Sequence, residues 1–364
     1  MGARLGDSSQ TNWMLFSFAN RVLAGCALLL SISYFLKKIP ALLLKSRFWL
    51  LIIIAVTIRI FSVVSSPNPP IDVFYILRDA PKLILEGKNP YKLNYPAPYG
   101  VYIPQIIFVY GPLTPFIFLP SVILFNDPRY MLIIFDLATA FLIYKLGKSL
   151  KIKESFIKAI IIIFLFHPLF PFMIEHAWLE PVMTFLLLLG VYCFNRQPKS
   201  LKGPLALGAV MAIKNVYFLP LAVYLAKQKS RLTNYLWMIL VPLVLSLPFL
   251  IADPKLFLER TLTYSTNSKA IAQALAPTDV SLSIAAVILK YTHIVLPNFL
   301  VILAGIIVSL VLVLKNHRTQ FFSLLSVFLI FIVLFMFGPF VFLNYFAFLG
   351  NILLFCLLLS LSRR

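Results

Sequence analysis

The sequence predicts an all-α polytopic membrane protein. Of its 364 residues, 61% are hydrophobic and only 12% are charged, and the mean hydropathy is +0.95. So few charged side chains could not cover the water-facing surface of a soluble protein. The apolar runs are continuous over about 17 to 22 residues, the length of a membrane-crossing helix, whereas the strands of a membrane barrel would alternate. Helices also satisfy their own backbone hydrogen bonds in lipid.

The formal net charge of +20 could by itself indicate a nucleic-acid partner. More than half of the 32 Lys and Arg residues, however, fall in six short segments between the apolar runs. These segments are 36–47, 145–158, 195–202, 227–231, 315–318 and 361–364. Such clustering is typical of the cytoplasmic loops of membrane proteins. The charge therefore predicts a multi-pass topology in the cell membrane, with these segments inside, and no nucleic-acid partner.

The first half of the chain is expected to build an external loop. Apolar runs at 13–35 and 48–64 lead out to a loop at 65–128, whose beginning is rich in Tyr and Pro. The apolar stretch 104–125 contains four prolines, which interrupt helical hydrogen bonding. A full crossing there would place the lysines of 145–158 outside, so we expect this stretch to lie in the interface or to be re-entrant.

The later apolar runs are expected to alternate across the membrane. They cover 129–146, 157–173, 179–194, 233–251, 293–314, 321–338 and 341–361, with a short broken pair at 203–213 and 216–226. The pattern predicts about eleven membrane segments. They form one integral membrane domain over 1–364, with a second external loop at 252–292.

Acidic residues gather on the predicted external side, although only Lys and Arg were used to orient the chain. They are Asp72, Asp79, Glu86, Glu175, Glu180, Asp253, Glu259 and Asp279. Asp and Glu contribute little to membrane orientation. The asymmetry therefore indicates that the external face carries the function.

Polar residues at the external ends of the predicted helices are the candidates for a site, because ionisable groups at a membrane edge are costly to bury. They are Asp72, Glu175, His176, Glu180, Lys214, Asn344 and Tyr345. No nucleotide motif and no metal-ligand spacing accompanies them, and Cys26, Cys193 and Cys356 all lie in apolar runs. The sequence therefore predicts no cofactor and requires no metal.

Structural explanations compete with these functional ones. Asp72 could cap a helix that begins near Val73. Lys214 could neutralise an acidic neighbour, and His176 could be an interface residue. Asp136, in the middle of an apolar run, is expected to pair with Arg59 or a tyrosine rather than to react.

The external loop also carries a family-like pattern. It reads Asp72-x2-Tyr75, then Ala80, then Leu85-x-Gly87-x2-Pro90-Tyr91. Further along come His167-Pro168, the link Glu175–Pro181, the stretch Gly208–Lys214 and Leu219-Pro220. In this order the motifs resemble membrane glycosyltransferases of the C superfamily, in particular the polyprenol-phosphate-mannose-dependent mannosyltransferases of glycosyltransferase family 87. The resemblance covers about residues 48–250; the usual Gly-Gln-x-Asn of the link is replaced by Glu175-His176-Ala177-Trp178.

The resemblance implies an inverting hexosyltransferase that moves a sugar, expected to be mannose, from a polyprenyl-phosphate donor to a glycan or glycolipid acceptor on the non-cytosolic face. Asp72 matches the aspartate proposed as catalytic base in that family. Lys214, or Arg78, is expected to meet the departing phosphate. Tyr75, Tyr91 and the polar residues above would contact the substrate, and membrane lipid would surround the chain. A lipid or sugar transporter or flippase, and a lipid-linked oligosaccharide ligase or polymerase, are the alternatives.

Overall fold

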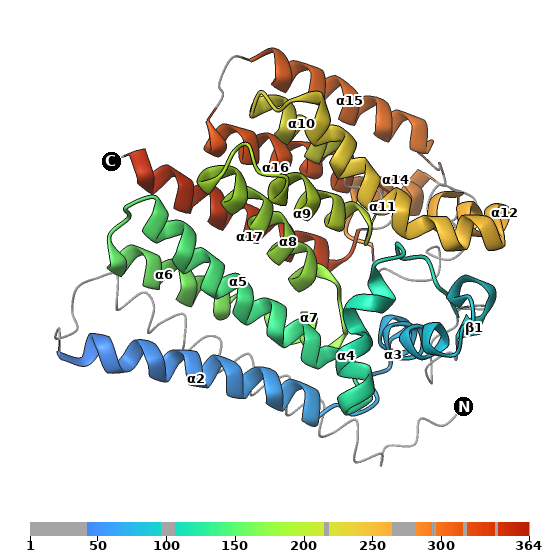
Figure 1. Ribbon diagram of the computed structural model, residues 1–364, viewed down its shortest axis with the longest axis horizontal. Helices are drawn as coiled ribbons and strands as arrows, with labels where there is room; N and C mark the ends of the chain where they lie inside the picture. Colours follow the sequence, from blue (N-terminus) through green and yellow to red (C-terminus); the bar gives the residue numbers. More distant parts are fainter. Residues whose placement is uncertain are drawn as a thin grey trace.

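The apolar runs form helices in the computed structural model, which describes residues 42–95, 106–214, 218–263, 281–292, 294, 296–315, 319–338 and 341–363. The predicted first span at 13–35 and Asp279 in the second external loop lie outside the described residues. Figure 1 shows a bundle of roughly aligned helices with smaller elements gathered at one end.

The first helices are α2 (Leu42–Val64), α3 (Asp72–Leu85), α4 (Thr114–Phe125), α5 (Arg129–Ser149), α6 (Glu154–Leu165), α7 (Phe170–Glu175) and α8 (Glu180–Arg196). They are followed by α9 (Lys202–Met211), α10 (Phe218–Lys227), α11 (Leu232–Ala252), α12 (Pro254–Leu258), α14 (Ile284–Thr292), α15 (Asn298–Leu314), α16 (Gln320–Phe337) and α17 (Leu343–Ser360). Between α3 and α4, a turn of 3-10 helix (Pro90–Lys92) precedes an antiparallel ribbon of β1 (Asn94–Tyr95) and β2 (Ile106–Ile107).

Four of the described helices, α5, α11, α16 and α17, are long and apolar enough to cross a membrane. Shorter apolar helices include α4 and α10. A helical chain with helices long and apolar enough to cross a membrane is therefore confirmed, while the number of crossings stays a prediction. At 12 residues, α4 rises about 18 Å, well short of a bilayer's hydrocarbon core of about 30 Å.

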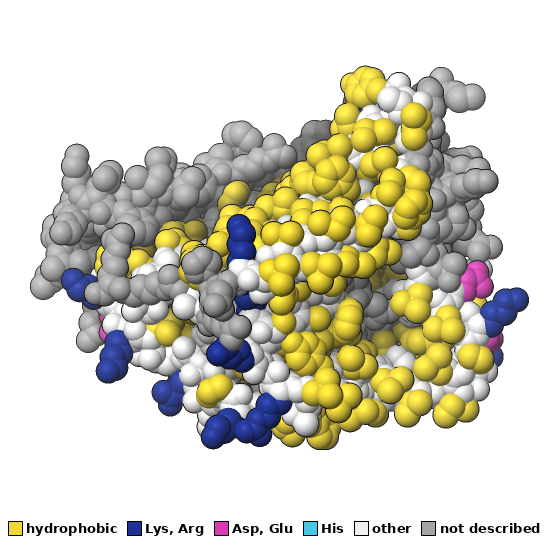
Figure 2. All heavy atoms as spheres, turned by 90° about the horizontal axis from the view of Figure 1, so that it is seen from above, with side chains coloured by type: hydrophobic (Ala, Val, Ile, Leu, Met, Phe, Trp, Pro, Cys, Tyr) yellow, Lys and Arg dark blue, Asp and Glu magenta, His cyan; other side chains and the backbone are white. Residues whose placement is uncertain are grey.

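One end of the bundle collects the predicted basic segments. Ser149, the last residue of α5, donates to Asn195 at the end of α8 (3.0 Å), and Asn195 in turn donates to Gln320 at the start of α16 (3.4 Å). Lys227, which ends α10, donates to the carbonyl of Lys315. We call this the basic end. Figure 2 shows most of the visible Lys and Arg side chains on one side of a broad hydrophobic surface.

The opposite end carries α3, the β ribbon and α12, and we call it the loop end (Figure 1). Tyr91 is its core. The ring of Tyr91 is fully buried and contacts Phe108, Phe249 and Phe257 at centroid distances of 4.9, 5.1 and 4.9 Å. The turn of 3-10 helix before the β ribbon is thereby packed against the end of α11 and against α12.

The apolar run 157–173 forms two helices, because α6 ends at Leu165 and α7 begins at Phe170, while its crossing of the membrane stays a prediction. Pro168 lacks a backbone N–H and disfavours a helical conformation in the residue before it, so the helix stops here. In the turn, the backbone amide of Leu169 donates to the Nδ1 atom of His167 at 3.2 Å. A break inside a bundle leaves carbonyl groups that need donors.

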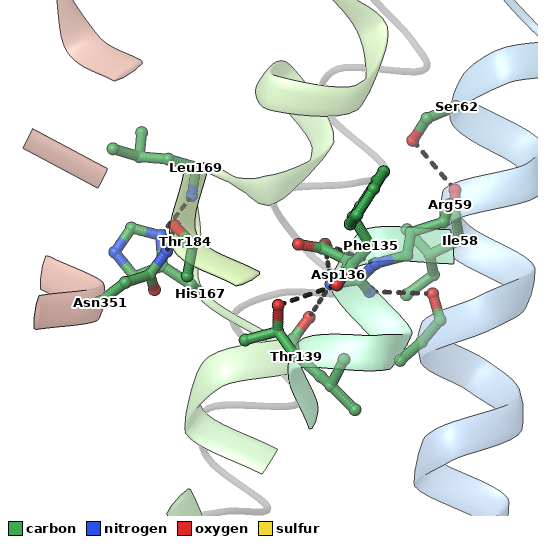
Figure 3. Close-up of polar contacts among 12 residues, drawn as sticks. Ile58, Arg59, Ser62, Phe135, Asp136, Thr139, His167, Leu169, Thr184 and Asn351 are labelled. Carbon is green, nitrogen blue, oxygen red and sulfur yellow. Dashed lines mark hydrogen bonds and ion pairs between the residues drawn. The ribbon is translucent and has the colours of Figure 1, made fainter. Parts of the chain in front are cut away.

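Arg59 of α2 supplies that donor. Its Nη2 atom donates to the carbonyl of Leu165 (3.1 Å) and to Oδ2 of Asp136 (2.9 Å), and its guanidinium lies 4.1 Å above the ring of Phe170. The expected pairing of Asp136 with Arg59 is therefore observed, and Arg59 is fully buried. Figure 3 shows this pair beside a second polar contact, Asn351 of α17 with Thr184 of α8 (3.3 Å). Three elements, α2, α5 and α6, are thus joined at one point.

Replacing Asp136 by Leu is expected to destabilise the protein by about 3 to 5 kcal/mol, because it leaves the Arg59 guanidinium buried without a counter-ion. Thermal unfolding of the purified chain in detergent measures the loss. The double variant Arg59→Leu/Asp136→Leu should recover part of it. Glu154→Gln is the control, since Glu154 forms exposed pairs with Lys148 and Lys158 and should shift Tm little. An equally small shift for Asp136→Leu would contradict the role given to the buried pair.

Candidate functional site

The loop before α4 docks on the turn that directly follows α9. The backbone amide of Gly111 donates to the carbonyl of Ile213 at 2.7 Å, and that of Leu113 donates to the carbonyl of Ala212 at 3.1 Å. These carbonyls have no partner within α9, because a helix leaves its last carbonyls unpaired. A Cβ atom on residue 111 would lie 2.2 Å from the carbonyl oxygen of Ala212, so only glycine permits this approach.

Lys214 follows this docked turn and meets two other elements. Its Nζ atom donates to Oε1 of Glu180 at 3.0 Å and lies 4.7 Å from the centroid of the Tyr345 ring. The amide of Asn344 donates to the same Glu180 oxygen at 2.9 Å. We call Glu180, Lys214, Asn344 and Tyr345 the polar cluster. The structure thus brings together four sequence-predicted residues from α8, from α17 and from the turn after α9.

Glu180 is the centre of the polar cluster. It is fully buried and is the first residue of α8, where the helix dipole favours a negative charge. The expected structural role of Lys214, neutralising an acidic neighbour, is therefore observed. A buried carboxylate needs a cation and hydrogen bonds to remain in the bundle, and Lys214 and Asn344 provide both.

Asp72 is the first residue of α3 and is partly buried. Burial raises the pKa of its carboxyl, an effect that the backbone amides of Val73 and Asp72 itself partly oppose. No Lys or Arg in the described part of the chain forms a salt bridge with it. The expected cap near Val73 is wrong in detail, because the helix begins one residue earlier and Ile71 takes the cap position without a side-chain bond.

Tyr110, which the sequence did not single out, links Asp72 with the polar cluster. Burial raises the pKa of its hydroxyl most, and the charge of Asp72 raises it further, while Lys214 lowers it. Tyr345 and Glu180 also act on it. Its carbonyl accepts a hydrogen bond from the hydroxyl of Tyr91 at 2.8 Å. The charges of Asp72 and of the polar cluster therefore both act on the hydroxyl of Tyr110, a partly buried side chain. The only sign of Tyr110 in the sequence was its place next to Gly111-Pro112 in a predicted loop.

Tyr75 and Arg78 continue from Asp72 along α3 at successive i+3 positions, which lie next to one another on a helix surface. The guanidinium of Arg78 lies 5.0 Å from the Tyr75 ring centroid and makes two hydrogen bonds to Asp79, at 2.7 and 2.8 Å. The Asp79 contacts raise the pKa of Arg78. We call Asp72, Tyr75 and Arg78 the α3 stripe.

The other predicted residues are Tyr91 at the loop end and Glu175 and His176 at the end of α7. Tyr91 is buried in the aromatic core of the loop end. Glu175 is buried at the end of α7. His176 makes a hydrogen bond through Nδ1 with the carbonyl of Phe172 (3.1 Å), and its ring lies 5.1 Å from that of Trp178. Burial lowers the pKa of His176, which favours the neutral ring.

Arg129 is a second residue that sequence reasoning missed. It is fully buried, forms a salt bridge with Asp127 (2.6 Å), donates to the carbonyl of Ser66 (2.7 Å), and lies 4.8 Å from the ring centroid of Phe74. It therefore fixes the start of α3, and with it Asp72, against the start of α5. The only signal was Asp127-Pro128-Arg129 at a helix start.

Within the described residues, no group of three or more His, Cys, Asp or Glu side chains could hold a metal ion. Comparison of the chain with protein-family models, with curated proteins and with solved structures gives no match. The chemistry of the site must therefore be argued from its own residues.

Gly111→Ala is expected to lower stability by about 1 to 3 kcal/mol, because the new Cβ would push the loop away from Ala212. Thermal unfolding measures this. Gly87→Ala is the control, since no atom lies within 4 Å of its added Cβ, although its positive φ of 67° carries a penalty of about 1 kcal/mol. Gly111→Ala with a smaller effect than Gly87→Ala would show that the close approach is unimportant.

Proposed function

We propose that this chain is a glycosyltransferase that moves a sugar, with mannose the expected one, from a polyprenyl-phosphate donor to a hydroxyl of a glycan or glycolipid. One observation carries the proposal. Asp72 is a partly buried carboxyl whose pKa burial raises, and its charge acts on the hydroxyl of the partly buried Tyr110, as the charges of the polar cluster do. A carboxyl without a salt-bridge partner beside hydrogen-bonding groups suits a general base.

In the proposed reaction, Asp72 takes the proton of the acceptor hydroxyl as its oxygen attacks the anomeric carbon of the donor sugar. The bond between that carbon and the phosphate oxygen breaks, and its electron pair stays on polyprenyl phosphate. A single displacement inverts the anomeric centre and needs one base. The leaving group is already activated, so the proposed step requires no metal.

The departing phosphate gains negative charge, which a nearby cation would stabilise. Arg78 is suited to this, because a guanidinium binds phosphate through two parallel hydrogen bonds and its raised pKa keeps it charged. Lys214 is the second candidate, although its charge is already balanced by the buried Glu180. Within the α3 stripe, Tyr75 lies between base and cation.

The proposal also assigns the membrane orientation. The basic end would lie in the cytoplasm and the loop end on the non-cytosolic face, in a multi-pass chain of about eleven segments. The α3 helix would lie along the membrane surface. Its strong amphipathic pattern and its exposed Leu85 support this, since such helices bury an apolar face at the lipid boundary.

Asp72→Asn should lower transfer from labelled polyprenyl-phosphate mannose to a membrane-lipid extract by at least about 100-fold, the lower range for a general base. Asp253→Asn is a matched control at the loop end. Asp253 accepts from the amide of Leu256 at 3.1 Å as the cap of α12, and asparagine caps equally well. Wild-type activity in Asp72→Asn would rule out the base assignment.

The pH dependence gives a separate check. A base acts when it is deprotonated, so kcat/KM should fall as the pH drops through the pKa of Asp72. Because burial raises this pKa, the fall should centre above the usual aspartate value of about 4. The measurement is kcat/KM from pH 4 to 8 with the polyprenyl-phosphate donor. A profile that stays flat down to pH 4 would contradict a raised pKa at the catalytic base.

A further inference from the structure

Two buried oxygen atoms of the polar cluster have no hydrogen-bond partner in the described part of the chain. They are Oε2 of Glu180 and Oδ1 of Asn344. Glu180 is 0% exposed and Asn344 is 6% exposed. Their other polar atoms are engaged: Oε1 of Glu180 accepts from both Lys214 and Asn344, and the Asn344 amide nitrogen is the donor of the second bond.

The amide orientation of Asn344 follows from its neighbour. A carboxylate can only accept, so the Asn344 nitrogen must face Glu180, and its oxygen is left as the unpaired atom. A buried acceptor without a donor is costly, and native structures seldom leave one unpaired. Two such acceptors on adjoining side chains therefore indicate an occupant that donates hydrogen bonds, either ordered water or a ligand hydroxyl.

The charges around these oxygens restrict what that occupant is. A second cation would be repelled by the Lys214 ammonium, 3.0 Å from Glu180. A phosphate would be repelled by the Glu180 carboxylate. A neutral molecule with several hydroxyl groups suits both, and the ring of Tyr345, which is only partly buried, lies beside them under the Lys214 ammonium. Lys214 is 14% exposed, so the cluster reaches the surface at that point.

We propose that Glu180 Oε2 and Asn344 Oδ1 accept hydrogen bonds from neighbouring hydroxyl groups of one sugar ring. The two side chains are joined by a 2.9 Å hydrogen bond, so a single ring can reach both oxygens. Lys214 is a positioning residue that holds the Glu180 carboxylate in place. This inference rests on the proposed function, because it takes the ring to be part of the substrate of the transferase.

Binding of methyl α-mannoside and methyl α-glucoside to the purified full chain tests the proposal without requiring transfer. The detergent must have no sugar head group, and saturation-transfer NMR gives the affinity. Asn344→Leu should weaken binding of the preferred glycoside about tenfold, the loss expected for a buried hydrogen bond left unmade. In a series of deoxy glycosides, each lacking one hydroxyl group, one compound should bind the wild-type protein about tenfold more weakly than the parent glycoside. The same compound should bind Asn344→Leu with the affinity that the parent glycoside has for that variant.

Asn351→Leu is the matched control. Asn351 lies on the same helix, is also buried, and donates to Thr184 rather than to the polar cluster. The folded Asn351→Leu protein should bind the glycosides like the wild type. If Asn344→Leu lowers Tm so far that the protein does not fold, Asn344→Ser, a smaller change, takes its place with the same expectation.

Equal glycoside affinity in Asn344→Leu and wild type, or no glycoside binding by the wild type, would overturn the inference. The outcomes separate it from the proposed function. Asn344-dependent binding without any transfer from polyprenyl-phosphate mannose would leave the sugar subsite standing and refute the transferase. Sugar transfer from the donor, together with a glycoside affinity that is the same in Asn344→Leu and wild type, would refute the sugar subsite and leave the transferase standing.

Discussion

The backbone groups released where helices break inside an apolar bundle set the constraint on which this structure depends. Lipid offers them no hydrogen bonds, so other parts of the protein must. Arg59 meets this need at the end of α6, and Asp136 balances the charge that Arg59 introduces. The amides of Gly111 and Leu113 meet it at the end of α9. Each break therefore ties together segments that are distant in the sequence.

The second of these breaks positions the candidate site. Docking of the loop on α9 places Tyr110 near Lys214, and Lys214 then reaches Glu180 and the ring of Tyr345. On the other side, the buried Arg129 holds the end of α2 and the start of α3 against α5, which sets the position of Asp72. The polar groups thus converge at the loop end because the unpaired backbone carbonyls at two helix ends, those of α9 and α2, find their hydrogen-bond donors there. The same convergence leaves Oε2 of Glu180 and Oδ1 of Asn344 without a hydrogen-bond partner among the described residues.

Sequence reasoning located helices well where an apolar run is long and uninterrupted. The runs at 129–146 and 321–338 correspond closely to α5 (Arg129–Ser149) and α16 (Gln320–Phe337). The run 157–173 is broken into α6 and α7, and the pair His167-Pro168 marks the helix end in the sequence. The grouping of Glu180, Lys214 and Asn344 was anticipated from their shared place at helix ends. The roles of Tyr110 and Arg129 were not, because each depends on a contact between distant segments that no local pattern encodes.

Chemical conversion of a polyprenyl-phosphate sugar is the central claim, and its main rival is movement of such a lipid across the membrane without reaction. The most direct measurement reconstitutes the chain in sealed liposomes with labelled polyprenyl-phosphate mannose or glucose and a membrane-lipid extract. Our account predicts that the label passes to a new product while free polyprenyl phosphate is released in equal amount. Chemically unchanged donor that appears in the opposite leaflet would contradict it.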